Sequence, residues 1–249
     1  MSGATSHPGG SPAGAPGNTL VVAHRGDPYR VRENTLASFR SAIAEGADAV
    51  ELDVRLSRDG VPVVVHDPGL KRLWGVDRAV ADLTVAEIRE ASAGGVPTLA
   101  EALGATFPTR VLIDLPEPDG ATARAAVATV AGDGSVDRVY WCGDPAALLA
   151  VRADDPTAEI ALTWKRSAPV RAGLVAEVRP RWLNYRFGLL DRATVDRARE
   201  AGYLLGAWTV DSGRTMRRLL AMGVDAITSN RPGTLRRAVD RAAAEGGER

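Results

Sequence analysis

The chain has 249 residues, of which 45% are hydrophobic and 25% charged, a composition that excludes disorder of the whole chain and is typical of a soluble globular protein. Its 31 basic side chains balance 31 acidic ones, so no overall field would attract nucleic acid or an anionic membrane, and any phosphate site must be local. The single cysteine, Cys142, cannot form an internal disulfide, which fits a reducing, cytoplasmic compartment. No stretch has the roughly 18 consecutive apolar residues of a membrane span, so we expect no stable membrane insertion.

Residues 1–18 are rich in Gly, Pro, Ser and Ala and predict a flexible N-terminal tail ahead of one domain over residues 19–249. From Thr19 onward, short β-branched runs alternate with longer segments of helical period, which is typical of βα units around a parallel sheet. The expected strands are residues 20–23, 49–54, 111–114, 138–141, 160–163, 182–184, 204–209 and 225–228. The expected helices are residues 35–45, 99–103, 121–131, 145–153, 169–178, 192–201, 214–222 and 234–244.

Eight such units without an internal linker, in a chain of about 250 residues, predict an α/β fold of the (β/α)₈ TIM-barrel type, although an open doubly wound sheet has the same local pattern. The second expected strand departs from the alternation, because it runs through Asp59-Gly60 into a further β-rich run over residues 61–66. This predicts a small β-hairpin extension after strand 2. A loop over residues 58–61 would set Asp53 opposite His66 on one face, whereas a loop one residue shorter would turn His66 away.

Two acids, Glu51 and Asp53, lie two residues apart on the apolar second strand, so both side chains project from one face. Two buried carboxylates side by side would repel, and one would take up a proton unless a cation held both ionised. A divalent ion that prefers oxygen ligands, such as Mg²⁺ or Ca²⁺, is the simplest account. The alternative is that one acid pairs with an arginine while the other faces solvent.

The first strand ends in His24-Arg25-Gly26, at the end of a barrel strand where catalysis takes place in α/β barrels. Histidine can transfer protons near neutral pH, arginine can bind a phosphate through two N–H groups, and glycine lets the backbone approach a ligand. His66 ends another β-rich run and precedes Asp67. His7 lies in the predicted tail, so His24 and His66 are the candidates for a general acid and base, with a hydrogen-bonded structural histidine as the alternative.

Taken in order, these residues resemble the motifs of the glycerophosphodiester phosphodiesterase family. The resemblance implies a (β/α)₈ barrel, a divalent metal bound by Glu51 and Asp53, catalytic roles for His24 and His66, and a phosphate contact from Arg25. Trp208 would then line the pocket beside a glycerol moiety, or would fill the barrel core. The matching segments are His24-Arg25-Gly26, Glu33-Asn34-Thr35, Glu51-Leu52-Asp53-Val54, Asp59-Gly60, His66-Asp67, Val96-Pro97-Thr98-Leu99-Ala100-Glu101, Ala207-Trp208-Thr209-Val210 and Gly223-Val224-Asp225-Ala226-Ile227 through Pro232.

The third expected strand departs from the family pattern, which places a Glu-x-Lys pair there for metal and phosphate. Here the corresponding positions are Asp114 and Pro116. Asp114 can still offer a metal ligand from a shorter side chain, whereas Pro116 offers no charge. Lys165, just past the fifth strand, either replaces the missing cation or is a solvated loop residue.

The function expected from the resemblance is metal-dependent hydrolysis of a small-molecule glycerophosphodiester to sn-glycerol 3-phosphate and an alcohol, by acid–base catalysis between two histidines. A phospholipase or sphingomyelinase D-like enzyme on the same barrel is one alternative, but it would need an exposed apolar lip. The other is a non-catalytic barrel that binds a phosphorylated ligand, which the altered third strand favours. Retention of both histidines and both acids of the second strand argues against it.

Overall fold

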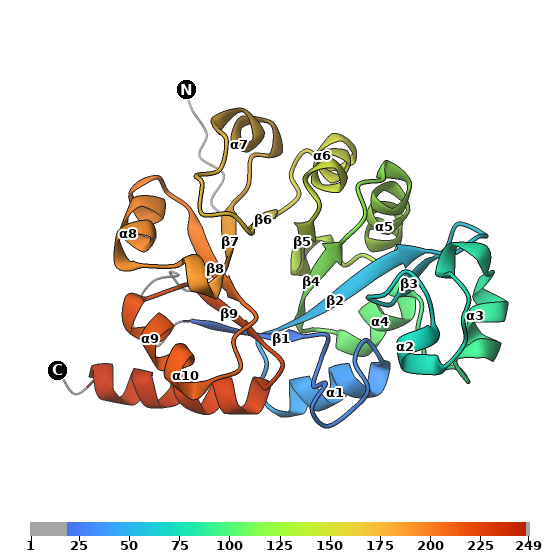
Figure 1. Ribbon diagram of the computed structural model, residues 1–249, viewed down its shortest axis with the longest axis horizontal. Helices are drawn as coiled ribbons and strands as arrows, with labels where there is room; N and C mark the ends of the chain where they lie inside the picture. Colours follow the sequence, from blue (N-terminus) through green and yellow to red (C-terminus); the bar gives the residue numbers. More distant parts are fainter. Residues whose placement is uncertain (1–18, 248–249) are drawn as a thin grey trace.

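A computed structural model describes residues 19–247, and the tail predicted for residues 1–18 lies outside them. Eight parallel strands form a nearly closed barrel with helices around it, which confirms the predicted fold (Figure 1). The strands neighbour one another in the order β5-β4-β2-β1-β9-β8-β7-β6. Their bounds are β1 Leu20–His24, β2 Ala49–Leu56, β4 Arg110–Leu115, β5 Val139–Gly143, β6 Ala161–Trp164, β7 Trp182–Arg186, β8 Leu204–Trp208 and β9 Ala226–Ser229.

The barrel closes between β5 and β6, where the pairing is reduced to a single bridge. Trp141 of β5 pairs with Ile160, and its backbone N–H donates to the Glu159 carbonyl at 2.9 Å. Every other neighbouring pair is a continuous parallel ladder. The carboxyl ends of all eight strands therefore meet at one end of the barrel.

The helices that follow the barrel strands begin where the sequence supplies a capping side chain. Six of them have an Asp, Ser or Thr whose side-chain oxygen accepts a hydrogen bond from the first helical turn: Thr35, Thr98, Asp119, Asp144, Asp191 and Ser212. The helices are α1 Leu36–Ala44, α4 Leu99–Thr106, α5 Gly120–Gly132, α6 Pro145–Asp154, α7 Ala172–Val178, α8 Arg192–Glu200, α9 Gly213–Met222 and α10 Pro232–Gly247. Within residues 19–247, no helix has both the length and the apolar character needed to cross a membrane.

Strand β3 (Pro62–Val64) runs antiparallel to β2 but in a different register from the predicted one. Leu56, not Ser57, pairs with Pro62, so the loop has five residues rather than four and Val65 takes the place opposite Asp53. Within the loop, the Gly60 N–H donates to the Ser57 carbonyl and the Ser57 N–H donates to the Val61 carbonyl, each at 3.0 Å. His66 lies beyond the end of β3, so the strand register does not decide where it points.

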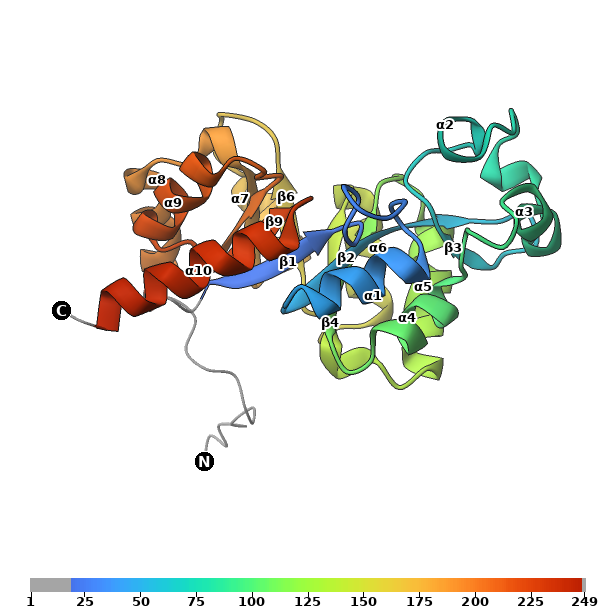
Figure 2. The same cartoon turned by 90° about the horizontal axis from the view of Figure 1, so that it is seen from below.

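Between β3 and α4 the chain makes an excursion that the strand–helix alternation did not predict. It contains α2 (Lys71–Trp74), a 3₁₀ turn (Val80–Asp82) and α3 (Val85–Ala91), and it lies at one end of the molecule (Figure 2). Helix α3 begins with a capping box between Thr84 and Glu87, a pattern that indicates a helix start and can be recognised in the sequence. A separate apolar cluster that includes Leu70, Leu83 and Ile88 holds the excursion together.

Candidate active site

The inward-facing side chains of the barrel change from apolar to polar along most of the strands. One layer is mainly apolar and includes Val22, Ala49, Leu112, Tyr140, Ala161, Trp182 and Ala226. Side chains of a strand point to the same face at every second residue, so the next inward layer contains the residues two positions further on. These are His24, Glu51, Asp114, Cys142, Thr163, Asn184 and Thr228, and all of them line a cavity of about 200 Å³.

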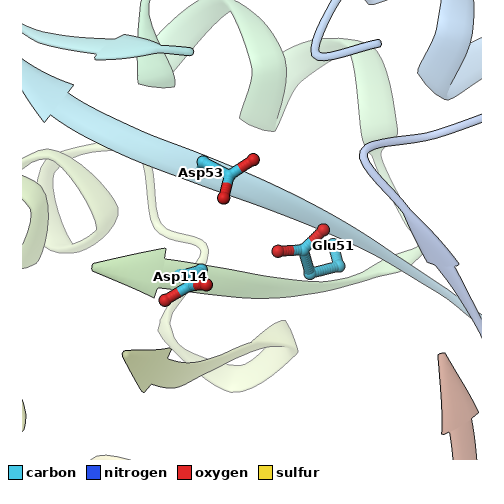
Figure 3. A group of neighbouring side chains, drawn as sticks. All are labelled: Glu51, Asp53 and Asp114. Carbon is cyan, nitrogen blue, oxygen red and sulfur yellow. The ribbon is translucent and has the colours of Figure 1, made fainter. Parts of the chain in front are cut away.

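Three carboxylates gather at the base of this cavity. Glu51 and Asp53 come from β2, and Asp114, which pairs with Asp53 in the ladder, comes from the neighbouring strand β4 (Figure 3). One oxygen of each lies within 4.8 Å of the others. Glu51 and Asp53 are only 3% and 1% exposed, so water cannot screen their repulsion.

This crowding changes the protonation of the carboxylates. Burial, with Asp53 beside it, raises the pKa of Asp114 to about 7. Burial and the two neighbouring acids raise the pKa of Glu51 well above its usual value. The cluster therefore holds protons near neutral pH unless a cation replaces them, which is the behaviour expected of a site that can bind a divalent metal ion.

Arg25 is the guanidinium that faces the cluster. Its Nε lies 3.2 Å from Asp53 Oδ2, an ion pair without hydrogen-bond alignment, while its Nη1 donates to Glu33 Oε1 at 2.9 Å. Its backbone N–H donates to Glu51 Oε2 at 2.9 Å. Arg25 also lines the cavity, so one side chain links the carboxylates to the space where a ligand would bind.

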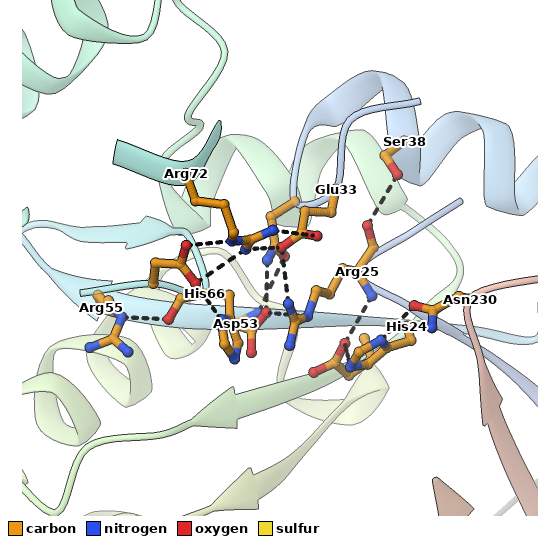
Figure 4. A network of polar contacts seen from close by, with 12 residues as sticks. His24, Arg25, Glu33, Ser38, Asp53, Arg55, His66, Arg72 and Asn230 are labelled. Carbon is orange, nitrogen blue, oxygen red and sulfur yellow. Dashed lines mark hydrogen bonds and ion pairs between the residues drawn. The ribbon is translucent and has the colours of Figure 1, made fainter. Parts of the chain in front are cut away.

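The backbone that carries Arg25 has a strained conformation held by a buried serine. Arg25 has a φ of +56° and Gly26 one of +88°, in the left-handed region that non-glycine residues seldom adopt. A Cβ at Gly26 would lie 2.7 Å from the Ser38 carbonyl carbon, so only glycine fits. Ser38, fully buried in α1, accepts from the Asp27 N–H at 2.7 Å. Its hydroxyl donates to the Arg25 carbonyl at 3.0 Å (Figure 4).

His24 contacts an asparagine on its side away from the carboxylates. Its Nδ1 lies 2.7 Å from Oδ1 of Asn230, the residue after β9, and its Nε2 lies 4.0 Å from Glu51 Oε2. Asn230 is in turn bonded to Asp211, which follows β8. Burial and the charge of Arg25 lower the pKa of His24, so the imidazole is neutral at neutral pH.

His66 belongs to an ionic network that reaches back to Arg25. Its Nδ1 lies 2.7 Å from Asp67 Oδ1, and Arg72 of α2 donates to both Asp67 oxygens. The hydrogen bond from Arg72 lowers the pKa of Asp67 to about 2. Arg72 also donates to Glu33 Oε1 at 2.6 Å, the same oxygen that accepts from Arg25 (Figure 4). Glu33 therefore links the excursion after β3 to Arg25, the candidate for phosphate binding.

The far wall of the cavity comes from β6, β7 and β8. Trp208 lines it and donates from Nε1 to the Asn184 carbonyl at 3.1 Å, so this tryptophan faces the pocket rather than filling the core. Lys165 also lines the cavity, with Nζ 5.5 Å from the centre of the Trp208 ring. Cys142 is 4% exposed, and burial raises the pKa of its thiol well above the usual value, so the thiol is not activated as a nucleophile.

The structure brings the predicted site residues together: seven of the candidates from the sequence line the cavity, and Asp53 forms an ion pair with Arg25. The hydrogen-bonding partners around them were not identified. Glu33 and Asn34 belong to a quoted motif but had no assigned role, and Asn34 Nδ2 donates to Asp53 Oδ2 at 2.7 Å. For Arg72, Asp211 and Asn230, the sequence contains no motif that indicates a contact with the site. Asp211 and Asn230 follow strands, and Arg72 lies in the excursion after β3. The seven that line the cavity are His24, Arg25, Glu51, His66, Asp114, Lys165 and Trp208.

Comparison with known proteins identifies the family. Residues 24–234 match the Glycerophosphoryl diester phosphodiesterase family. This chain belongs to that family. A glycerophosphodiester phosphodiesterase of Caldanaerobacter subterraneus subsp. tengcongensis is 29% identical over 233 residues, which cover 87% of this chain and 96% of the relative.

Solved structures of glycerophosphodiester phosphodiesterases and related enzymes have the same fold. An Oleispira antarctica phosphodiesterase, in complex with the product sn-glycerol-3-phosphate, matches with a TM-score of 0.80 and 27% identity over 89% of this chain and 96% of its own. The glycerophosphodiester phosphodiesterase of Thermotoga maritima matches with a TM-score of 0.75 and 26% identity over 89% and 98%. As a member of this family, the chain is a phosphoric diester hydrolase.

The hydrogen bonds of Ser38 lead to a stability prediction. Replacing Ser38 by Ala leaves the buried Asp27 N–H without an acceptor and should lower the free energy of unfolding by about 1–3 kcal/mol, measured by urea denaturation. The matched control is Ser41→Ala on the same helix, which removes a hydroxyl that donates to the Asp27 carboxylate. If Ser38→Ala were no more destabilising than Ser41→Ala, the loop would not depend on this serine.

Proposed function

We propose that this phosphodiesterase catalyses the metal-dependent hydrolysis of a glycerophosphodiester to sn-glycerol 3-phosphate and an alcohol. The observation that carries the proposal is the convergence of two imidazoles, one guanidinium and three carboxylates at one cavity. A phosphodiester needs these groups, because its charge must be neutralised while protons move at the attacking and leaving oxygens. The product bound by the Oleispira antarctica phosphodiesterase supports the choice of sn-glycerol 3-phosphate.

Glu51, Asp53 and Asp114 would hold the metal ion. Their all-oxygen donor set suits Mg²⁺ or Ca²⁺. The raised pKa values of Glu51 and Asp114 mark a cluster that lacks positive charge. When bound, such an ion supplies Lewis-acid neutralisation of a phosphoryl oxygen. Arg25 already lies against Asp53, so the guanidinium and the carboxylates occupy adjoining positions on the cavity wall.

Side chains of the protein bind the phosphate and transfer the protons. Arg25 binds the phosphate by directing N–H groups at its oxygens. One histidine removes a proton from the attacking oxygen as its bond to phosphorus forms, and the other gives a proton to the alkoxide released when the second P–O bond breaks. In both His24 and His66, Nδ1 is occupied by a protein partner, so Nε2 is the nitrogen left for the substrate. Trp208 provides an apolar wall for the glycerol moiety.

The direct test is an assay of the purified protein with glycerophosphocholine, glycerophosphoethanolamine and a chromogenic phosphodiester. Each substrate is incubated with EDTA and then with added Mg²⁺, Ca²⁺ or Mn²⁺. We expect sn-glycerol 3-phosphate from the two glycerophosphodiesters, and free chromophore from the third substrate, only with metal, because three carboxylates and one arginine cannot by themselves neutralise the phosphodiester. His24→Gln and His66→Gln should each lower kcat by about 10²- to 10⁴-fold. Absence of metal-dependent product from every substrate would favour a barrel that only binds a phosphorylated ligand.

Lys165 is proposed as the cation that acts in place of the lysine missing at Pro116. It lines the same cavity as Arg25, and its charge lowers the pKa of Asp114 against the effect of burial, so its field reaches the carboxylate cluster. Its exposed position at the end of β6 lets the ammonium turn toward a bound phosphate. Two cations would then face the phosphate from opposite walls.

Lys165→Met should lower kcat/KM for the phosphodiester by about 10²-fold, since one contact to the developing phosphoryl charge is lost. Arg166→Met, which removes the adjacent exposed charge, is the matched control and should leave turnover unchanged. Unchanged turnover in Lys165→Met would show that the lysine is a solvated loop residue.

A further inference from the structure

Asp211 and Asn230 form a hydrogen-bonded pair just past the carboxyl ends of β8 and β9. Asn230 also contacts His24 (Figure 4). Asp211 Oδ2 accepts from Asn230 Nδ2 at 2.8 Å. Its other oxygen accepts from the Asn230 backbone N–H at 2.9 Å and from the Ser229 hydroxyl at 3.1 Å. Three donors therefore fix this carboxylate in one orientation.

The pair fixes the orientation of the Asn230 amide. A carboxylate only accepts hydrogen bonds, so the amide must turn its NH₂ group toward Asp211. Its carbonyl oxygen, Oδ1, is then the atom that lies 2.7 Å from His24 Nδ1. An amide oxygen also only accepts, so the hydrogen of the neutral imidazole must be on Nδ1.

We infer that Asp211 and Asn230 are positioning residues that set the tautomer of His24. With the hydrogen on Nδ1, the neutral ring turns an unprotonated Nε2 to the side of Glu51 and the cavity. This nitrogen can accept a proton from an attacking oxygen, whereas the opposite tautomer would present an N–H there and could not. The inference rests on the proposed catalytic role of His24, but the tautomer itself exists without substrate.

Replacing Asp211 by Asn should reverse the tautomer while keeping the shape of the side chain. The oxygen of the new amide can still accept from the Asn230 N–H and the Ser229 hydroxyl, which directs its NH₂ group at the Asn230 side chain. Two NH₂ groups cannot pair, so the Asn230 amide turns over and donates to His24 Nδ1. The imidazole hydrogen then moves to Nε2.

Exchanging both residues should restore the tautomer. In the double variant Asp211→Asn/Asn230→Asp, the amide at 211 donates to the carboxylate at 230, whose second oxygen accepts from His24 Nδ1. The hydrogen returns to Nδ1, so the double variant regains function that the single variant Asp211→Asn has lost. A role confined to stability would not predict this recovery.

The experiment reads the tautomer directly from long-range ¹H–¹⁵N spectra of the imidazoles at pH 8. The chain has three histidines, so His7→Gln and His66→Gln variants assign the signals of His24. We expect Nδ1–H in the wild type and in the double variant, and Nε2–H in Asp211→Asn. The same Asp211→Asn variant should lose about tenfold or more in kcat, with little change in KM. Asp191→Asn, a helix cap outside the cavity, is the control for loss of one charge.

An Nε2–H tautomer in the wild type, or an unchanged tautomer in Asp211→Asn, would overturn the inference. So would a reversed tautomer that left kcat unaffected. If Asp211→Asn did not fold, the wild-type spectrum and the double variant would still decide the matter. A wild-type protein that shows Nδ1–H but hydrolyses no phosphodiester would contradict the proposed function and leave the tautomer assignment intact.

Discussion

The repulsion among Glu51, Asp53 and Asp114 is the constraint on which the rest of the site depends. Three carboxylates with oxygens within 4.8 Å of one another, two of them almost fully buried, cannot all ionise unless positive charge is close by. Arg25 supplies part of this positive charge. Its left-handed backbone lets the main-chain N–H donate to Glu51 while the guanidinium pairs with Asp53. The positive charge that is still missing is the reason that we propose a divalent cation at this end of the barrel.

The barrel brings the three carboxylates together and also positions the side chains that surround them. Because parallel strands lie side by side, Asp53 and Asp114 are ladder partners, and the period of two along β2 brings Glu51 to the same face. The groups that we propose to act on a substrate are each held by a second side chain. Asn230 contacts His24 and Asp67 contacts His66, while Glu33 and Arg72 join Arg25 to the excursion after β3. Loops far apart in sequence therefore converge on one cavity, as expected for the carboxyl end of an α/β barrel.

The strands and the residues on them could be predicted from the sequence, because a strand fixes the face of each side chain by simple alternation. Glu51 and Asp53 follow from this alternation, whereas His24 follows from its place at a strand end and Asp114 from the family pattern. The β2–β3 register was wrong, since the turn after Leu56 is one residue longer than Asp59-Gly60 indicates and turn geometry sets register. The short helices α2 and α3 were missed because the alternating pattern has no place for them, although Thr84 and Glu87 form a recognisable capping box. The contact of Asn230 with His24 joins residues 206 positions apart, a closeness that exists only once the barrel closes.

The most direct test of this account is the thermal stability of the chelator-treated protein with and without Mg²⁺, Ca²⁺ or Mn²⁺, at pH 5 and pH 8. The folded-state pKa of Asp114 is about 7, above the value of an unfolded aspartate, so the metal-free fold holds a proton that the unfolded chain has lost. Its stability should fall as pH rises from about 4 to about 7, and a bound cation should offset that loss. We predict a rise in Tm on adding metal that is larger at pH 8 than at pH 5 and is abolished in Glu51→Gln. A Tm that no divalent ion raises at pH 8 would contradict the claim that these carboxylates form a metal site.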